Sequence, residues 1–267
     1  MRHPPRRPPP RTQHRPNRPE GHASDLSKVA GLAAVSALFA QAPERVERLF
    51  FTPERRRDAE PFCKIMAEAR KTYRQVPPEE LARIGGSVLT GGILALARPR
   101  PVADLDPVAA ALWAHEIPLL LILDGVGNPH NLGAIARTAA FFGLDRLVLS
   151  DHPAQAGPSD AAHRVAEGGL EFLSLWRAHK LPLVLKRIRP NFRVIATAPD
   201  QGKTIDQIPR DKPIALVLGN EEDGLSAPTL AACDDRLVLP GTGKIQSLNV
   251  AATAAILIHA LHTPTRR

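Results

Sequence analysis

The feature that most constrains the fold is an alternation of short apolar runs with helical patterns in the C-terminal half of the chain. The runs are rich in Leu, Ile and Val, which is typical of strands buried on both faces. The alternation therefore predicts an α/β fold, with helices on both faces of a parallel sheet. The predicted strands are 119–123, 147–149, 194–196, 214–218 and 237–239, and the predicted helices are 130–142, 159–167, 178–188 and 247–262. Residues 173–176 suit an extra edge strand, and 181–185 suit a strand as well as a helix.

The N-terminal part is organised differently. Residues 1–24 are mostly Pro, Arg and His, too polar to offset the entropy of ordering, so we expect a disordered tail. Residues 25–98 predict a small α/β unit, and 99–112, with three prolines and two aspartates, predict a linker. The larger α/β unit then covers 113–267. Within the small unit we expect helices at about 25–38, 61–73 and 77–84 and strands at 46–51 and 91–97.

The charge of the chain is concentrated near its N-terminus. The first 22 residues hold six arginines and one acid, and residues 23–100 hold 13 basic and 9 acidic residues. The remainder is nearly neutral, with 16 basic and 17 acidic residues. A basic tail on a basic small unit indicates a polyanion such as RNA or DNA as partner.

The same composition argues against other classes of protein. No apolar run reaches the length of a membrane span, and no apolar segment follows the basic N-terminus as in a secretory signal. The two cysteines, Cys63 and Cys233, lie far apart without metal-type spacing, so we expect no metal site and a reducing, cytoplasmic location.

Three turns that follow predicted strands carry unusual sequence, and in open α/β sheets ligands bind at such strand ends. The first turn, 124–133, has Gly125 and Gly127 but His130 where a dinucleotide fingerprint needs its third glycine. That spacing disfavours a dinucleotide-binding enzyme. Binding of NAD, and of no other cofactor, would favour that alternative again. The second turn, 217–225, is glycine-bounded and acidic, and the third, 239–249, is glycine-rich and precedes a long helix.

The third turn contains two polar residues of interest. Ser247 is a candidate N-cap for the helix that follows. Asn249 is expected just inside that helix, where its side chain competes with the backbone and calls for a specific partner.

Together the three turns resemble the motifs of the SpoU (TrmH-type) RNA 2′-O-ribose methyltransferases of the SPOUT superfamily, within a little-studied tRNA/rRNA methyltransferase subgroup. The order and spacing agree, although Leu239-Pro240-Gly241 stands where the family usually has Ile-Pro-Met. The resemblance covers about 117–262 and extends weakly to 26–97. The matching residues are Asp124, Val126, Pro129, Asn131, Gly133 and Arg137, then Gly219, Glu221 and Gly224, then Pro240, Gly243, Ser247 and Asn249.

The resemblance implies a parallel-sheet domain with a deep trefoil knot, preceded by a small substrate-binding domain. It implies S-adenosylmethionine (SAM) as cofactor, tRNA or rRNA as substrate, and a homodimer with the final helix in its interface. The cofactor-binding residues that it implies are Thr197, Gly219, Leu239, Pro240, Gly243, Ser247 and Leu248.

The implied reaction is attack of a ribose 2′-hydroxyl on the SAM methyl group. The family motif assigns the catalytic site to Arg137, Asn131, Glu221 and Asn249. Because a guanidinium stays protonated, we interpret Arg137 as a stabiliser of the developing alkoxide and a phosphate ligand.

Basic residues of the small unit are candidates for RNA contact: Arg55, Arg56, Arg57, Lys64, Arg70 and Lys71. A non-catalytic RNA-binding relative that kept the knot is the alternative reading. The altered third motif favours that alternative, whereas the retained Arg137, Asn131 and Asn249 argue against it.

Overall fold

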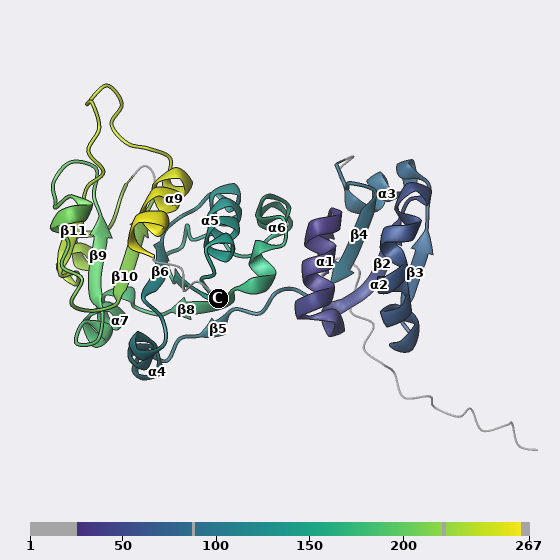
Figure 1. Cartoon of the computed structure of the whole chain (residues 1–267), viewed down its shortest axis with the longest axis horizontal. Coiled ribbons are helices and arrows are strands. Elements are labelled where there is room, and N and C mark those ends of the chain that lie inside the picture. The colour runs from purple at the N-terminus through teal and green to yellow at the C-terminus, as the bar shows by residue number, and fades with distance from the viewer. Residues whose placement is uncertain (1–25, 87–88, 221–222, 263–267) are drawn as a thin grey trace, which may run out of the picture.

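The computed structural model describes residues 26–86, 89–220 and 223–262, so the predicted tail at 1–24 lies outside the described residues. Two sheets organise this part of the chain, one in each of two units that lie side by side (Figure 1). The N-terminal sheet has the order β1-β4-β2-β3; β4 runs antiparallel to β1 and β2, and β3 runs parallel to β2. Its elements are β1 (Ser27–Ala30), α1 (Leu32–Gln41), β2 (Val46–Phe51), α2 (Arg56–Glu68), β3 (Thr72–Gln75), α3 (Pro78–Gly85) and β4 (Ile93–Ala97).

The helix predicted from about residue 25 is partly wrong. Its first turn is strand β1, which pairs with β4, and the helix begins only at Leu32. Gly31 separates the two elements with φ of +92°, a conformation that favours glycine. The prediction of a helix over 61–73 is shifted, because α2 begins at Arg56 and ends at Glu68 and strand β3 follows.

The C-terminal sheet has seven strands, all parallel, in the order β11-β9-β10-β6-β7-β8-β5. This confirms the expected α/β class. Because the strands are parallel, the turns that follow β6, β9, β10 and β11 meet at one edge of the sheet. Its strands are β5 (Ala103–Asp104), β6 (Leu119–Asp124), β7 (Arg146–Ser150), β8 (Ser174–Ala178), β9 (Arg193–Thr197), β10 (Ile214–Gly219) and β11 (Asp235–Leu237).

Helices cover both faces of this sheet, as buried strands require. Successive residues of β6 face opposite cores: Leu121 packs in one core and Leu120 in the other. Helices α5 and α9 contribute to the first core, and α4 and α7 contribute to the second. The helices are α4 (Pro107–Leu112), α5 (Pro129–Phe141), α6 (Asp160–Ala166), α7 (Leu181–Ile188), α8 (Ala227–Ala231) and α9 (Val250–Leu261).

The segment 99–112, expected as a linker, contains regular structure. Strand β5 pairs with β8, so β8 is not the edge strand that we predicted, and α4 packs on the second core. The connection is thereby built into the C-terminal sheet. Within residues 26–86, 89–220 and 223–262, no helix is long and apolar enough to cross a membrane.

Candidate functional site

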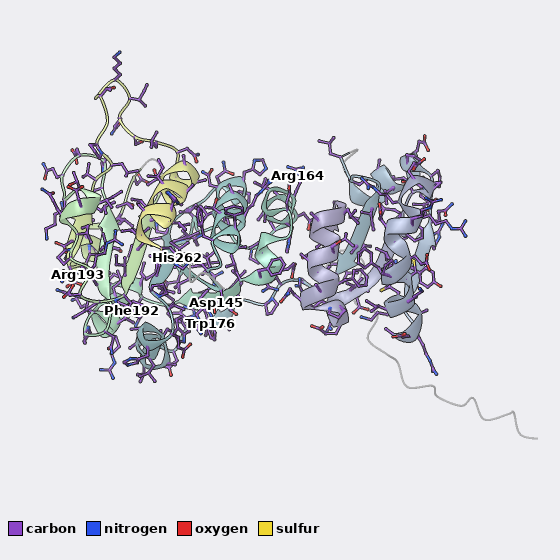
Figure 2. All side chains as sticks on the ribbon, in the orientation of Figure 1. Asp145, Arg164, Trp176, Phe192, Arg193 and His262 are labelled. Carbon is purple, nitrogen blue, oxygen red and sulfur yellow. The ribbon has the colours of Figure 1, made fainter. Side chains whose placement is uncertain are left out.

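A cavity of about 560 Å³ opens at the carboxyl ends of β9, β10 and β11, between these strands and α9. It brings together segments that are far apart in the sequence, including the ends of the 239–249 loop. That loop projects from the unit with its middle side chains in open space (Figure 2). Of the predicted cofactor residues, Thr197, Gly219, Leu239, Ser247 and Leu248 line the cavity. Pro240 and Gly243 belong to the same loop but do not line it.

Gly219, the last residue of β10, lines this cavity and packs closely against the turn that follows. A Cβ atom there would lie 2.8 Å from Cγ of Leu225 and 2.9 Å from the backbone of Gly224. Such distances are too short for real contacts, so only glycine fits without a shift of the turn. The turn at Gly224 and Leu225 therefore packs directly on the end of β10.

The first and third motifs meet through two asparagines. The side-chain amide of Asn249 donates a hydrogen bond to Oδ1 of Asn131 at 3.1 Å. Asn249 also caps α9, because its Oδ1 accepts from the backbone N–H of Ala251 at 2.9 Å. The predictions of Ser247 as N-cap and of Asn249 inside the helix are therefore wrong; Asn249 itself is the cap, and Asn131 is its specific partner.

Arg137 lies on the same helix as Asn131, but on its outer surface. Its Nη1 pairs with Oε1 of Glu167 at 3.0 Å, and both side chains are a little over half exposed. Arg137 does not line the 560 Å³ cavity of its own chain. Glu221, the remaining predicted catalytic residue, lies outside the described residues.

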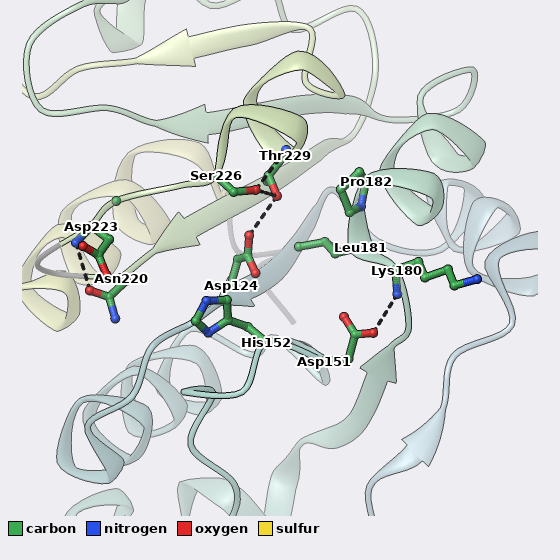
Figure 3. Close-up of a pocket in the computed structure, with 11 residues that line it drawn as sticks. Asp124, Asp151, His152, Lys180, Leu181, Pro182, Asn220, Asp223, Ser226 and Thr229 are labelled. Atoms are coloured by element: carbon green, nitrogen blue, oxygen red, sulfur yellow. Dashed lines mark hydrogen bonds between the residues drawn. The ribbon is translucent and has the colours of Figure 1, made fainter.

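A second cavity of about 260 Å³ lies at the carboxyl ends of β6, β7 and β8 (Figure 3). The buried carboxylate of Asp124 faces it and accepts a hydrogen bond from the hydroxyl of Thr229 at 2.9 Å. Asn220, Asp223 and Gly224 line both cavities, and Nδ2 of Asn220 donates to the carbonyl of Gly125 at 2.8 Å. This cavity thus joins the ends of the first and second motifs.

Neither cysteine is suited to nucleophilic chemistry. Burial raises the pKa of the Cys233 thiol to about 12, and burial also raises the pKa of Cys63. Within the described ranges no three His, Cys, Asp or Glu side chains cluster in a way that could hold a metal ion.

The predicted RNA-contact residues fall into two groups. Arg56, Arg57, Lys64 and Arg70 are exposed on or just after α2, and Lys64 pairs with Glu60 at 3.1 Å. Arg55 and Lys71 are instead used within the unit: Arg55 pairs with Asp58 at 2.9 Å, and the ammonium of Lys71 donates to the carbonyls of Glu44, at 2.8 Å, and Val46.

Comparison with known proteins decides the family. The model of the SpoU rRNA methylase family matches residues 118–259, and that of the RNA 2′-O ribose methyltransferase substrate-binding domain matches 28–103. The chain belongs to the SpoU rRNA methylase family. The SpoU match covers the seven-stranded sheet from β6 onward and all three motifs, as their resemblance indicated.

Relatives at about 30% identity agree with this family. The chain is 30% identical over 233 residues to the 23S rRNA (guanosine-2′-O-)-methyltransferase RlmB of Nitrosomonas europaea, covering 86% of this chain and 88% of that protein. It is also 30% identical to the uncharacterized tRNA/rRNA methyltransferase YfiF of Escherichia coli O157:H7, covering 88% of this chain and 67% of that protein. The solved structure of the SpoU methyltransferase AviRb from Streptomyces viridochromogenes, in complex with AdoMet, has a TM-score of 0.70 at 21% identity and covers 92% and 93% of the two chains.

Sequence reasoning missed several residues of the larger cavity. The charged side chains Asp200 and Arg236 line it, and so does Thr253 on α9. Asp200 comes three residues after the end of β9, so its position at a strand end was a usable signal. Arg236 lies within a strand and Thr253 within a helix. Only the three-dimensional arrangement shows that these two side chains line the cavity.

Proposed function

We propose that this SpoU-family chain transfers the methyl group of SAM to a ribose 2′-hydroxyl of RNA. The observation that carries the proposal is the cavity at the ends of β9, β10 and β11, which the second and third family motifs form. Its volume of about 560 Å³ lies within the range of roughly 300–1,000 Å³ typical of small-molecule sites. The strand end at Gly219 and the mixed polar and apolar lining suit a cofactor with a base, a ribose and a charged amino-acid end.

The residues that would hold SAM are those of the strand ends. Thr197, Gly219, Leu239 and Leu248 line the cavity and are proposed to bind it, largely through backbone groups. Ser247 and the neighbouring Pro240 and Gly243 shape the loop around it. When bound, SAM supplies an electrophilic methyl group on a sulfonium. The knot implied by the resemblance is part of this proposal.

Arg137 is proposed as the main catalytic residue. A ribose hydroxyl is a weak nucleophile and gains from stabilisation of its developing negative charge. A guanidinium cannot accept a proton, but it can donate two hydrogen bonds to an alkoxide and a phosphate. Asn131 and Asn249, which hold each other at 3.1 Å, are proposed to orient the site together with Glu221.

We infer that the protein is a homodimer with α9 and the end of α5 in the interface. Phe141, at the end of α5, is 83% exposed, and Ile256 on α9 is 43% exposed. The two helix ends are neighbours, since the rings of Phe142 and His259 lie 5.8 Å apart. Exposed apolar side chains on neighbouring helix ends favour association. Because Arg137 does not line the cavity of its own chain, association with a partner subunit is also proposed to complete the site.

The substrate is proposed to be rRNA or tRNA, in the cytoplasm. The relatives named above are named for these two RNA classes. The small N-terminal unit is proposed to contact RNA through exposed cations of α2 and its C-terminal end, because arginine and lysine bind phosphates without sequence preference. These cations are Arg56, Arg57, Lys64 and Arg70, with Arg55 and Lys71 as further candidates.

The test combines SAM binding by calorimetry with methyl transfer to purified rRNA and tRNA, for wild type, Arg137→Ala and Arg137→Lys. We expect all three proteins to bind SAM, and Arg137→Ala to lose about 100-fold in kcat, as for loss of one charge-stabilising donor. Arg137→Lys keeps the charge but lacks the two-pronged geometry, so its kcat should lie between the others.

Two outcomes would contradict the proposal. If the wild-type protein does not bind SAM, then SAM is not its cofactor. SAM binding without transfer to either RNA would favour a non-catalytic RNA-binding protein.

A further inference from the structure

The turn that follows α6 lies between the two units of the chain. At its centre Gly168 has φ of +93°, and a Cβ there would lie 2.8 Å from Cβ of Ala37 and 3.1 Å from the carbonyl oxygen of Ala33. Both alanines belong to α1 of the N-terminal unit. The backbone of this turn therefore packs directly on the small unit, with no room for a side chain.

The same turn also packs on the proposed catalytic helix. A Cβ at Gly169 would lie 2.7 Å from Cα of Arg137. Glu167, which has a positive φ of 45° although it is not glycine, pairs with the guanidinium of Arg137 at 3.0 Å. Positive φ is costly for a glutamate and persists only where surrounding contacts hold it. One short segment thus touches α1 on one side and Arg137 on the other.

A buried ion cluster fixes this segment to the N-terminal unit. The side chain of Glu171 is fully buried, and its Oε2 accepts from Arg45 at 2.6 Å and from Arg100 at 2.9 Å. Arg45 belongs to the short 3-10 helix η2 (Pro43–Arg45) of the small unit and also donates to the carbonyl of Arg98, at 3.0 and 3.1 Å. A buried carboxylate is tolerated only when it is paired, and separation of the units would leave Glu171 with Arg100 and with His163, whose Nδ1 lies 3.6 Å from Oε1.

We propose that Glu171 and Glu167 are positioning residues for methyl transfer. Glu171 holds the substrate-binding unit in a fixed orientation through Arg45, and Glu167 sets the orientation of Arg137. This rests on the proposed function, because it takes Arg137 as catalytic and the small unit as the RNA holder. RNA held by one unit must reach an arginine on the other, so the orientation of the small unit sets how well RNA binds at the site. The orientation of Arg137 sets the rate, because a displacement of about 1 Å at a reacting group costs up to roughly 100-fold.

The test uses the full chain with three variants. Arg45→Met removes the inter-unit ion pair but leaves Glu171 paired with Arg100. Arg48→Met removes the same charge from an exposed position of β2 and is the matched control. Glu167→Gln removes the partner of Arg137 while keeping its size.

The first readout does not depend on activity. Hydrogen exchange followed by mass spectrometry should be about tenfold faster or more at α1 and at residues 167–172 in Arg45→Met, with Arg48→Met unchanged there. Equal exchange in Arg45→Met and Arg48→Met would overturn the role of Glu171. This measurement stands even if wild type methylates no RNA, so it separates failure of this inference from failure of the proposed function.

The second readout is a split of kinetic constants on rRNA or tRNA, whichever the wild type methylates. We expect Arg45→Met to raise KM for RNA about tenfold with kcat within about twofold, and Glu167→Gln to lower kcat about tenfold with KM unchanged. The Kd for SAM should not change in either variant. A purely structural role would move both constants together or neither, and either result would overturn the proposal.

Discussion

Gly219 shows how one residue can fix the shape of a site's wall. Its replacement by alanine forces a Cβ to within 2.9 Å of the backbone of Gly224, so the turn after β10 must shift. We expect Gly219→Ala to weaken SAM binding about tenfold or more, because backbone groups of this turn are the proposed ligands. Gly157→Ala is the control, since that position has open space and no positive φ. Calorimetric Kd values that agree for the two variants would contradict the proposal.

Asn249 illustrates, at the same scale, what can and cannot be read from sequence. The need for a specific partner was predictable, because asparagine near a helix start competes with the backbone. The identity of that partner was not, since Asn131 lies 118 residues earlier. Likewise the placement of Arg137 beside Glu167 depends on how α5 and α6 pack, and no local pattern encodes it.

At the scale of elements, the strands of the large sheet were predictable because each is a short run buried on both faces. Strand β1 was not, because four residues that alternate between buried and half-buried also fit a helical period when a helix follows directly. Strand β3 is exposed along its whole length, so it has no apolar pattern to detect. Short strands without buried side chains depend on neighbours for their conformation.

The end of α5 carries the clearest prediction at this scale. We expect Phe141→Asp to convert a dimer to a monomer, because a charge at the centre of an apolar interface is costly to bury. Leu183→Asp, on α7 at the opposite face of the sheet and 60% exposed, should leave the assembly unchanged. Sedimentation velocity measures both. A wild-type protein that sediments as a monomer, or a dimeric Phe141→Asp, would exclude this interface.

Helix α6 brings a titratable group into the boundary between the units. His163 is buried there, and burial lowers its pKa, with the nearby cations Arg45 and Arg100 acting in the same direction and Glu171 and Asp160 opposing them. The unfolded chain therefore takes up a proton on this group at higher pH than the folded chain does. The contribution of neutral His163 to the free energy of unfolding is fully present above the ordinary histidine pKa of about 6.5. It is lost as the pH falls below that value.

The measurement is Tm against pH. Wild type should lose Tm more steeply between about pH 7.5 and 5.5 than His163→Gln, which cannot take up the proton. Parallel curves for the two proteins would show that His163 does not titrate on unfolding.

For the whole molecule, the division of charge predicts how RNA affinity depends on salt. The first 22 residues hold six arginines. We expect their deletion to weaken RNA binding at low salt and to reduce the slope of log affinity against log salt, because fewer counterions are released. SAM affinity should stay the same. Filter binding of rRNA between about 50 and 200 mM salt measures the slope, and an unchanged affinity at low salt would refute a role for this segment in binding.

The pairing of the first and last motifs has a consequence for the order in which a nascent chain can fold. All strand pairs of the N-terminal sheet lie between Ser27 and Ala97, so this unit has its partners early in synthesis. Strand β6 can pair early with β7, but its other neighbour, β10, follows about 95 residues later, and α5 packs on α9, which is later still. Until the ribosome has delivered those segments, apolar surface of β6 and α5 stays uncovered, so we expect this half to need chaperones most.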